Sequence, residues 1–326
     1  MDVKRNLLWF IIILMLVGFA SVSLGEEWVR KANMPTPRII FSTSEVNGII
    51  YAIGGWIGYP IATVEAYAPG TDTWTKKADM PIARGYLSTS EVNGIIYAIG
   101  GWDGSQYLST VEAYDPATDT WTKKADMPSQ RSALSTSVVN GIIYAIGGYS
   151  LSTRVEAYDP VTNTWAKKAD MPTARWYFST CVVNGIIYAI GGWDGSTSRA
   201  EVEAYNPATD TWTKKANMLY GRYALSTGVV NGIIYAFGGY SSYIAAYDPS
   251  TDTWTTKADM PSQRGSACAN VLNGRIYVIG GGTDATMSSA LPEGVVEAYD
   301  PFRAPKRPSL DTDKLATLWG KVKVSD

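Results

Sequence analysis

The chain has 326 residues, with 28 basic and 30 acidic side chains, a formal net charge of −2, and no histidine. The chain lacks the excess of basic residues that is typical of nucleic-acid-binding proteins, so we expect no nucleic-acid partner. The absence of histidine excludes Ser-His-Asp and Cys-His catalysis and every histidine-ligated metal site. We therefore expect neither a metal nor a cofactor.

The first 25 residues differ in character from the rest. Lys4 and Arg5 precede an uncharged apolar run from Leu7 to Ala20, and small residues follow as far as Gly25. This pattern predicts a signal peptide, residues 1–25, that is cleaved after Gly25. The apolar run is shorter than the ~20 residues of a membrane span, although an uncleaved anchor is the alternative. We expect a secreted or periplasmic (cell-envelope) protein, with no membrane span after cleavage.

Residues 26–301 consist of one unit repeated six times. The block Asn-Gly-Ile-Ile-Tyr-Ala-Ile-Gly-Gly recurs with small changes, at a period of 42 to 47 residues. Each unit contains four short β-rich runs, separated by Asn-Gly, a loop of variable length and an Asp-Pro turn. A period in this range indicates an array of supersecondary units. The unit therefore predicts a four-stranded antiparallel sheet, with strands named a to d below.

The two ends of the repeat array complement each other. The sixth unit has no Trp-containing strand d after Pro301, whereas an isolated strand of this type, beginning near Trp28, precedes the first unit. The N-terminal strand is therefore predicted to complete the sixth sheet. The predicted fold is all-β, a six-bladed β-propeller, and we expect it to be a monomer.

The repeat motif resembles that of the kelch family. Gly-Gly ends strand b, a tyrosine lies in strand c, and a tryptophan follows about seven residues later; the tyrosines are Tyr67, Tyr114, Tyr158, Tyr205, Tyr247 and Tyr299. The resemblance implies the same propeller fold and says almost nothing about activity. Residues 302–326 lie outside the repeats. Ser309 is predicted to cap a short helix there, which either packs under the propeller or serves as a sorting or docking tail.

The two faces of the predicted ring differ in sequence. The a–b and c–d turns are nearly constant, whereas the b–c loops range from four to 14 residues. Aromatic residues concentrate on this variable face, and they supply contact area at low entropic cost. The candidate ligand-binding aromatics are Trp56, Tyr86, Trp102, Tyr149, Trp176, Tyr177, Trp193, Tyr223 and Tyr240. The alternative is that these rings only pack on one another.

An arginine opens every strand a, and a glutamate lies in strand c of every unit except the fifth. The arginines are Arg38, Arg84, Arg131, Arg175, Arg222 and Arg264, and the glutamates are Glu65, Glu112, Glu156, Glu203 and Glu297. The pattern predicts a structural Arg–Glu pair in five blades. The fifth unit has Ala245 in place of the glutamate, and Met218-Leu219-Tyr220 in place of the usual Met-Pro. Departures from a repeat indicate function, so we expect the binding centre near blades four and five, with Arg222 holding an anionic or polyhydroxyl group.

Two functions fit these features. The first is an exported, non-catalytic binding module that recognises a carbohydrate or a protein through its aromatic face. The alternative is a sugar epimerase or mutarotase similar to the kelch-type N-acetylneuraminate epimerases, which would act through Arg and Glu. The only cysteines, Cys181 and Cys268, occupy different repeat positions and are predicted to be free, buried thiols.

Overall fold

The computed structural model describes residues 27–149, 153–283 and 294–302. The predicted signal segment, and the tail beyond Phe302 with its predicted helix, lie outside the described residues. Contacts separate one compact unit, Trp28–Tyr299, from the two ends of the chain. The fold of this unit positions all of the candidate residues.

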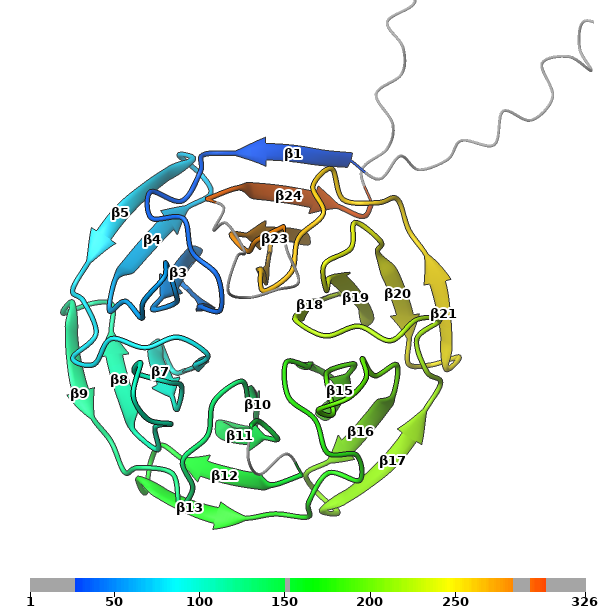
Figure 1. The fold of residues 1–326 in the computed structure, drawn as a ribbon, viewed down its shortest axis with the longest axis horizontal. Coiled ribbons are helices and arrows are strands. Elements are labelled where there is room, and N and C mark those ends of the chain that lie inside the picture. The colour runs from blue at the N-terminus through cyan, green and yellow to red at the C-terminus, as the bar shows by residue number, and fades with distance from the viewer. Residues whose placement is uncertain (1–26, 150–152, 284–293, 303–326) are drawn as a thin grey trace, which may run out of the picture. The chain divides into compact units, whose positions relative to one another are not determined.

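The described residues form 24 strands and no helix, arranged in six four-stranded antiparallel sheets around a ring (Figure 1). Blade 1 contains β2 (Ser42–Val46), β3 (Ile49–Ile53), β4 (Val64–Ala68) and β5 (Thr73–Lys77). Blade 2 contains β6 (Ser88–Val92), β7 (Ile95–Ile99), β8 (Val111–Asp115) and β9 (Thr120–Lys123). Blade 3 contains β10 (Ser135–Val139), β11 (Ile142–Ile146), β12 (Val155–Asp159) and β13 (Thr164–Lys167).

The other three blades repeat this pattern, and the last one differs in its outer strand. Blade 4 contains β14 (Ser179–Val183), β15 (Ile186–Ile190), β16 (Val202–Asn206) and β17 (Thr211–Lys215). Blade 5 contains β18 (Leu225–Val230), β19 (Ile233–Gly238), β20 (Ala245–Asp248) and β21 (Thr253–Thr256). Blade 6 contains β22 (Cys268–Leu272), β23 (Arg275–Ile279), β24 (Val296–Asp300) and β1 (Glu27–Lys31). The six-bladed propeller predicted from the repeat is confirmed.

The a–b hairpins form because their Asn-Gly pairs suit a two-residue turn. In blade 3, Asn140 and Gly141 both have positive φ angles, 51° and 76°, and Val139 pairs with Ile142 across the turn. A type I′ turn needs this conformation at both central residues, which favours Asn-Gly. The turn therefore sets the register of strands a and b.

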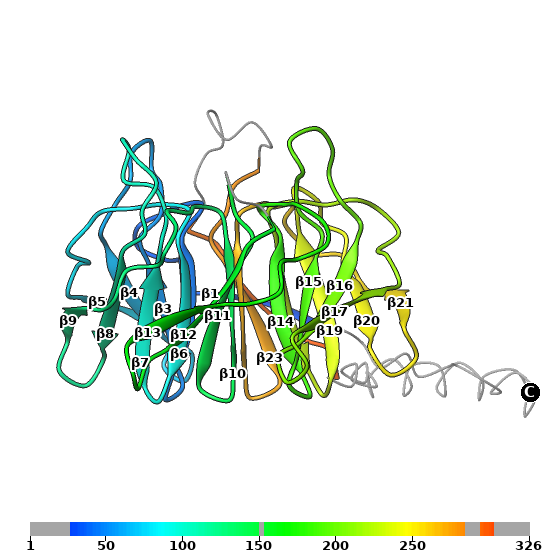
Figure 2. The same cartoon turned by 90° about the horizontal axis from the view of Figure 1, so that it is seen from below.

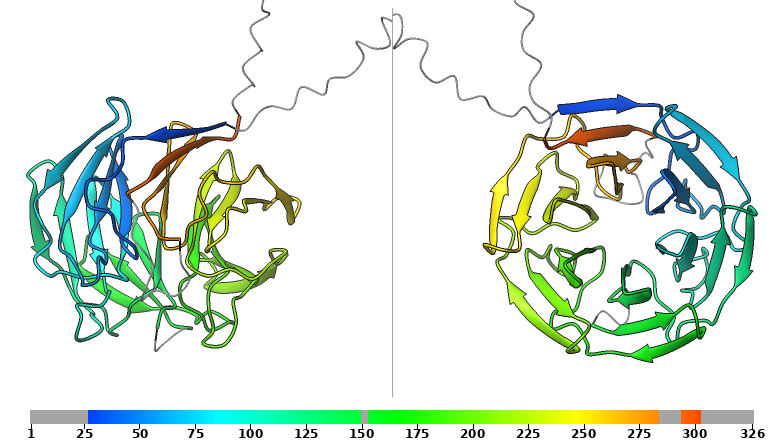
Figure 3. Two further views of the ribbon diagram at one scale, coloured as in Figure 1. Left: turned by 45° about the horizontal axis from the view of Figure 1, so that its top comes forward. Right: turned by 180° about the vertical axis from the view of Figure 1, so that it is seen from behind.

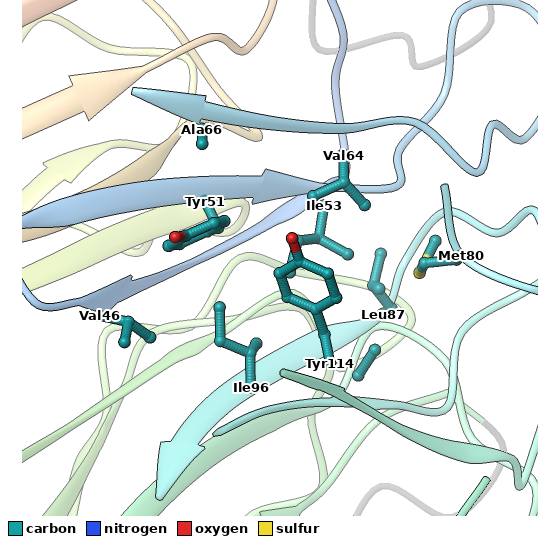
Figure 4. Packing of buried hydrophobic residues seen from close by; sticks show 10 residues of the cluster. Val46, Tyr51, Ile53, Val64, Ala66, Met80, Leu87, Ile96 and Tyr114 are labelled. Carbon is teal, nitrogen blue, oxygen red and sulfur yellow. The ribbon is translucent and has the colours of Figure 1, made fainter. Parts of the chain in front are cut away.

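The core consists of apolar layers between neighbouring blades. Between blades 1 and 2, Tyr51 of β3 meets Tyr114 of β8 edge-on, with ring centroids 5.8 Å apart, and Ile53 and Ile96 pack beside them (Figure 4). Burying aromatic and aliphatic side chains in such layers is the main source of stability. Equivalent tyrosine pairs occur at the other five interfaces: Tyr97–Tyr158, Tyr144–Tyr205, Tyr188–Tyr247, Tyr235–Tyr299 and Tyr277–Tyr67.

The ring closes as the sequence predicts. Strand β1 pairs with β24, so the sixth sheet has the order β1-β24-β23-β22 and joins both ends of the repeat array (Figure 3). The ring of Trp28 packs on Tyr299, with centroids 4.9 Å apart. Longer b–c loops rise on one face and the short turns lie on the other (Figure 2). The aromatic candidates lie on the face of the longer loops.

Candidate functional site

Main-chain pairing places the aromatic residue that follows Gly-Gly in blades 1 to 4. Trp56, Trp102 and Trp193 form isolated bridges with the residue just after the arginine that opens strand a in their own blade. Tyr149 is held similarly, since its N–H donates to the Ser132 carbonyl at 2.8 Å. Because the backbone fixes these positions, each ring stands at the same place in its blade.

The rings of the variable face contact one another across blades. Trp56 stacks on Trp102 with centroids 5.3 Å apart, and Trp102 meets Tyr86 at 6.4 Å. The series continues through Tyr177, 5.8 Å from Tyr86, and Tyr223, 6.4 Å from Tyr177. Two further rings contact Tyr223: Trp193 at 5.2 Å and Tyr240 at 5.6 Å. The structure therefore brings these seven predicted residues into one continuous aromatic series.

A pocket of about 320 Å³ opens beside this series, between blades 2, 3 and 4. Its lining comprises six aromatic side chains and one serine: Tyr86, Trp102, Tyr107, Ser132, Tyr149, Trp176 and Tyr177. Tyr149 is 42% exposed, contacts Trp176 edge-to-face at 5.3 Å and meets Tyr107 at 5.1 Å. Five of the ten predicted site residues thus line one pocket. We refer to it as the aromatic pocket.

Tyr107 and Ser132 line the aromatic pocket but are absent from the residues predicted as the site. Tyr107 lies in the b–c loop of blade 2, where its backbone bridges back to Trp102. The corresponding loop of blade 4 has Ser198 bridged to Trp193. The contrast between tyrosine and serine in otherwise similar loops was a signal in the sequence for Tyr107; Ser132 gave none.

Three tyrosine hydroxyl groups of the aromatic pocket, those of Tyr86, Tyr107 and Tyr177, stay protonated. Burial raises the pKa of Tyr86, and also that of Tyr107, whose hydroxyl is hydrogen-bonded to Tyr149. Burial, together with the nearby Tyr86, raises the pKa of Tyr177 far above its usual range. The pocket therefore offers neutral hydroxyl groups that both donate and accept hydrogen bonds.

Tyr86 and Tyr177 also form the boundary between the aromatic pocket and the centre of the ring. Both line a second, central cavity of about 150 Å³ together with the start of strand a from all six blades. Both residues have positive φ angles, 56° and 54°, as do the equivalent residues Ile40, Ala133, Ala224 and Ser266. This uncommon conformation turns each side chain toward the ring axis. The hydrogen-bonded pair Tyr86–Tyr177 therefore forms the floor of the pocket.

The predicted Arg–Glu pairs are present in five blades. Arg131 and Glu156 lie 2.6 Å apart, Arg175 and Glu203 2.7 Å, and all five paired arginines are fully buried. The other pairs are Arg38–Glu65, Arg84–Glu112 and Arg264–Glu297. Each guanidinium also donates to backbone carbonyls, as Arg175 does to Gly191 and Glu201. These pairs are structural, as expected.

Arg222, in the fifth blade, has no carboxylate partner among the described residues. Its guanidinium donates to the carbonyls of Tyr243 at 2.9 Å and Gly238 at 3.4 Å, and contacts Met218 Sδ at 3.5 Å. Arg222 is only 5% exposed, lies over the ring of Tyr243, and does not line the aromatic pocket. Burial lowers its pKa to about 10, so it remains charged at neutral pH. Arg222 therefore lies below the surface. The aromatic pocket lies between blades 2, 3 and 4.

Two carboxylates of the variable face are engaged within their own loops. Asp103 accepts hydrogen bonds from the backbone N–H groups of Ser105 and Gln106, both at 2.8 Å. Asp194 accepts from Thr197 and Ser196 and pairs with Arg199 at 2.7 Å, and these interactions lower its pKa to about 2. Both residues therefore shape their turns, and the sequence Trp-Asp-Gly-Ser, which both loops share, favours turn formation.

Within residues 27–149, 153–283 and 294–302, no group of three or more Cys, Asp or Glu side chains is arranged to hold a metal ion. The same ranges contain no helix with the length and apolar character of a membrane span.

Comparison with known proteins identifies the class. A family model described as the KLHDC2/KLHL20/DRC7 Kelch-repeats domain matches residues 127–281, and the Kelch motif matches residues 41–81 and 83–128. The chain belongs to the kelch-repeat family. Among solved structures, one described as "Structure of YjhT" is similar, with a TM-score of 0.70 and 17% identity over 80% of this chain and 94% of the other. At this identity the likeness concerns the fold alone. No protein with a curated description matches the chain significantly.

Proposed function

We propose that the protein is an exported, non-catalytic binding module that recognises a carbohydrate or a protein through the aromatic pocket. The supporting observation is the convergence of six aromatic side chains from three blades on one pocket of about 320 Å³. Ligand sites are typically concave, largely apolar and supplied with a few polar groups, and their volume starts at about 300 Å³. Main-chain bridges and hydrogen bonds just beyond the strand ends hold these residues in place before a ligand arrives, which lowers the entropic cost of binding.

The alternative function, epimerisation of a sugar through Arg and Glu, has weaker support. It requires acidic and basic groups that open onto the variable face. The glutamates of strand c are instead buried and bonded to arginines, Asp103 and Asp194 are bonded within their loops, and the partly exposed Glu201 pairs with Arg199. We therefore propose recognition without catalysis. Faster exchange of free N-acetylneuraminate anomers in the presence of the protein, followed by NMR, would contradict this part of the proposal.

The binding function is tested by two matched variants. Tyr149 is exposed and lines the pocket, whereas Tyr59, 61% exposed, lies outside it on the b–c loop of blade 1. The full chain is screened on a glycan array and against a library of immobilised peptides. Tyr149→Ala is expected to lose at least tenfold in affinity for the ligand found, and Tyr59→Ala to bind it normally. Equal binding by both variants would place recognition elsewhere.

Export is tested separately. Expression of the full chain in a bacterial host, followed by fractionation and N-terminal sequencing, is expected to yield a periplasmic product that starts at Glu26. A cytoplasmic product that retains residues 1–25 would overturn export and leave the binding proposal intact.

A further inference from the structure

We propose that the aromatic pocket selects a neutral pyranose unit of an oligosaccharide and discriminates against acidic sugars. This inference rests on the proposed binding function and narrows its ligand to one chemical class. Three properties of the pocket support this inference: its size, its polar groups and the absence of charged side chains from its lining.

The size of the pocket favours a sugar over a protein surface. Its volume of about 320 Å³ lies near the lower end of the range for small-molecule sites. A stable protein partner buries roughly 1,200–2,000 Å² over a broad area. Depth is also limited, because the hydrogen-bonded pair Tyr86–Tyr177 separates the pocket from the central cavity. A single six-membered ring therefore matches this space better than a folded partner.

The arrangement of rings and hydroxyl groups suits a pyranose. A pyranose has C–H groups on its faces and hydroxyl groups around its edge, so it needs aromatic walls and hydrogen-bonding groups together. Trp102 and Trp176 supply walls from blades 2 and 4, while Ser132 and the tyrosines supply hydroxyl groups. Tyr86, Tyr107 and Tyr177 remain protonated because burial raises their pKa values. Their hydroxyl groups can therefore donate to sugar oxygens and accept from sugar hydroxyls.

Further aromatic side chains lie next to the pocket on two sides. Trp56 stacks on Trp102 at the blade 1 side, and Tyr223 and Trp193 follow Tyr177 at the blade 4 side. Aromatic surface thus continues on both sides of the pocket. We expect neighbouring sugar units to lie on it, so affinity should rise from a monosaccharide to a trisaccharide.

The expected discrimination against acidic sugars follows from the absence of charged side chains in the pocket lining. None of the seven lining residues is Lys, Arg, Asp or Glu. The nearest acidic residue along the chain, Asp103, directs its carboxylate to the Ser105 and Gln106 N–H groups. Arg222, which lacks a carboxylate partner in the described ranges, is buried against the ring of Tyr243 and does not line the pocket. A ligand carboxylate would lose hydration here without gaining a cation, which is unfavourable.

The experiment uses a glycan array that displays neutral glycans together with uronic-acid and sialylated glycans. The full chain is expected to bind glycans without acidic groups. The best neutral glycan is then compared in solution with its counterpart in which one C6 hydroxymethyl group is a carboxylate, by calorimetry and by quenching of tryptophan fluorescence. We expect the neutral form to bind at least tenfold more tightly.

A charge-insertion variant provides the matched control. Tyr149→Lys places a cation at an exposed position of the pocket lining, so the ratio of neutral to acidic affinity is expected to fall by about tenfold relative to the parent. Tyr59→Lys adds the same charge outside the pocket and should leave the ratio unchanged. Circular dichroism of both variants verifies that the propeller is folded.

The possible results separate this inference from the proposed function. Equal or tighter binding of the acidic counterpart, with loss in Tyr149→Ala, would overturn neutral selectivity while the binding module stands. Binding of peptides but not glycans, again lost in Tyr149→Ala, would overturn the carbohydrate class alone. If neither array gives binding, both the inference and the proposed function fail.

Discussion

The guanidinium of Arg222 lies over the ring of Tyr243, with its central carbon 5.3 Å from the ring centroid. In blade 4, the equivalent Arg175 meets Glu203, which in turn accepts a hydrogen bond from Thr173 and lies opposite Lys214 across the sheet. In blade 5, the residues at the positions of Glu203, Thr173 and Lys214 are Ala245, Tyr220 and Thr256, respectively. The Tyr243 hydroxyl bonds Thr256 at 3.1 Å, and its ring meets Tyr220 at 6.1 Å. Aromatic side chains thus cover the buried arginine in blade 5, whereas an ionic network surrounds its equivalent in blade 4.

Tyr243→Ala should destabilise the propeller by about 2–3 kcal/mol, because it removes both the cation–π contact and the cover over a buried charge. Urea unfolding monitored by circular dichroism measures the change. Tyr220→Ala, which alters a ring that is 62% exposed, should cost less than about 1 kcal/mol.

A second substitution tests the reason for this loss. Adding Ala245→Glu to Tyr243→Ala restores the Arg–Glu pair of the other blades, and is expected to recover at least half of the lost free energy of unfolding. If the double variant is less stable than Tyr243→Ala alone, the two arrangements are not equivalent solutions for this arginine.

Glu203→Ala should lower the free energy of unfolding by about 3–5 kcal/mol, since it leaves the fully buried Arg175 without its counter-ion. Glu201→Ala is the control, because Glu201 pairs at 3.3 Å with the partly exposed Arg199. We expect the control to cost about 1 kcal/mol or less. Similar losses in both variants would show that burial does not govern the strength of these pairs.

Four aspartates of the c–d turns should make the fold sensitive to acid. In blade 2, Asp119 accepts a hydrogen bond from the Tyr114 hydroxyl at 2.6 Å and another from the Ala78 N–H of the preceding blade at 2.9 Å. These bonds lower the pKa of Asp119 from its usual 3.8. The corresponding residues Asp72, Asp210 and Asp252 have lowered pKa values for the same reason.

A pKa lowered in the folded state adds stability that is complete above the unfolded-state value and is lost as the pH falls through the folded-state value. Thermal stability should therefore decline below about pH 4. The quadruple Asp→Asn variant is expected to show a shallower decline. Blade 3 supplies the natural precedent, because Asn163 accepts the same two bonds, from Tyr158 at 2.7 Å and Ala125 at 2.9 Å. An unchanged acid profile would mean that other carboxylates control it.

Both cysteines should be unreactive in the folded protein. They are free, as predicted, but partly rather than fully buried; desolvation raises the pKa of each thiol to about 12, so little thiolate exists at pH 8. Alkylation by iodoacetamide at pH 8, followed by mass spectrometry, is expected to label neither thiol in native buffer and both in urea. Rapid native labelling of Cys268 would reveal that the central cavity admits the reagent.

The repeat carried most of the information about the fold. Turn residues, strand lengths and the isolated Trp28 strand each followed a local rule repeated six times, so blade number, ring closure and the Arg–Glu pairs were predictable. The gathering of aromatic rings was predictable for the same reason. The aromatic pocket was less so, because Tyr107 reaches it through the path of an irregular loop that returns to Trp102. Tyr243 over Arg222 is likewise a contact between replaced residues, which no repeat pattern specifies.

The inner rim of the ring consists of main chain bonded to main chain. The Tyr86 N–H donates to the Ile40 carbonyl at 2.8 Å, the Ala133 N–H to Tyr86 at 2.8 Å, and the same bond links Tyr177, Ala224 and Ser266 in turn. These main-chain bonds involve no side chain, and the hydroxyl groups of Tyr86 and Tyr177 are hydrogen-bonded to each other in addition. Isoleucine, alanine, serine and tyrosine can therefore occupy these positions of the central cavity with the same main-chain bonds. The side chains that line the central cavity can thereby change during evolution while the bonds that close the ring stay the same.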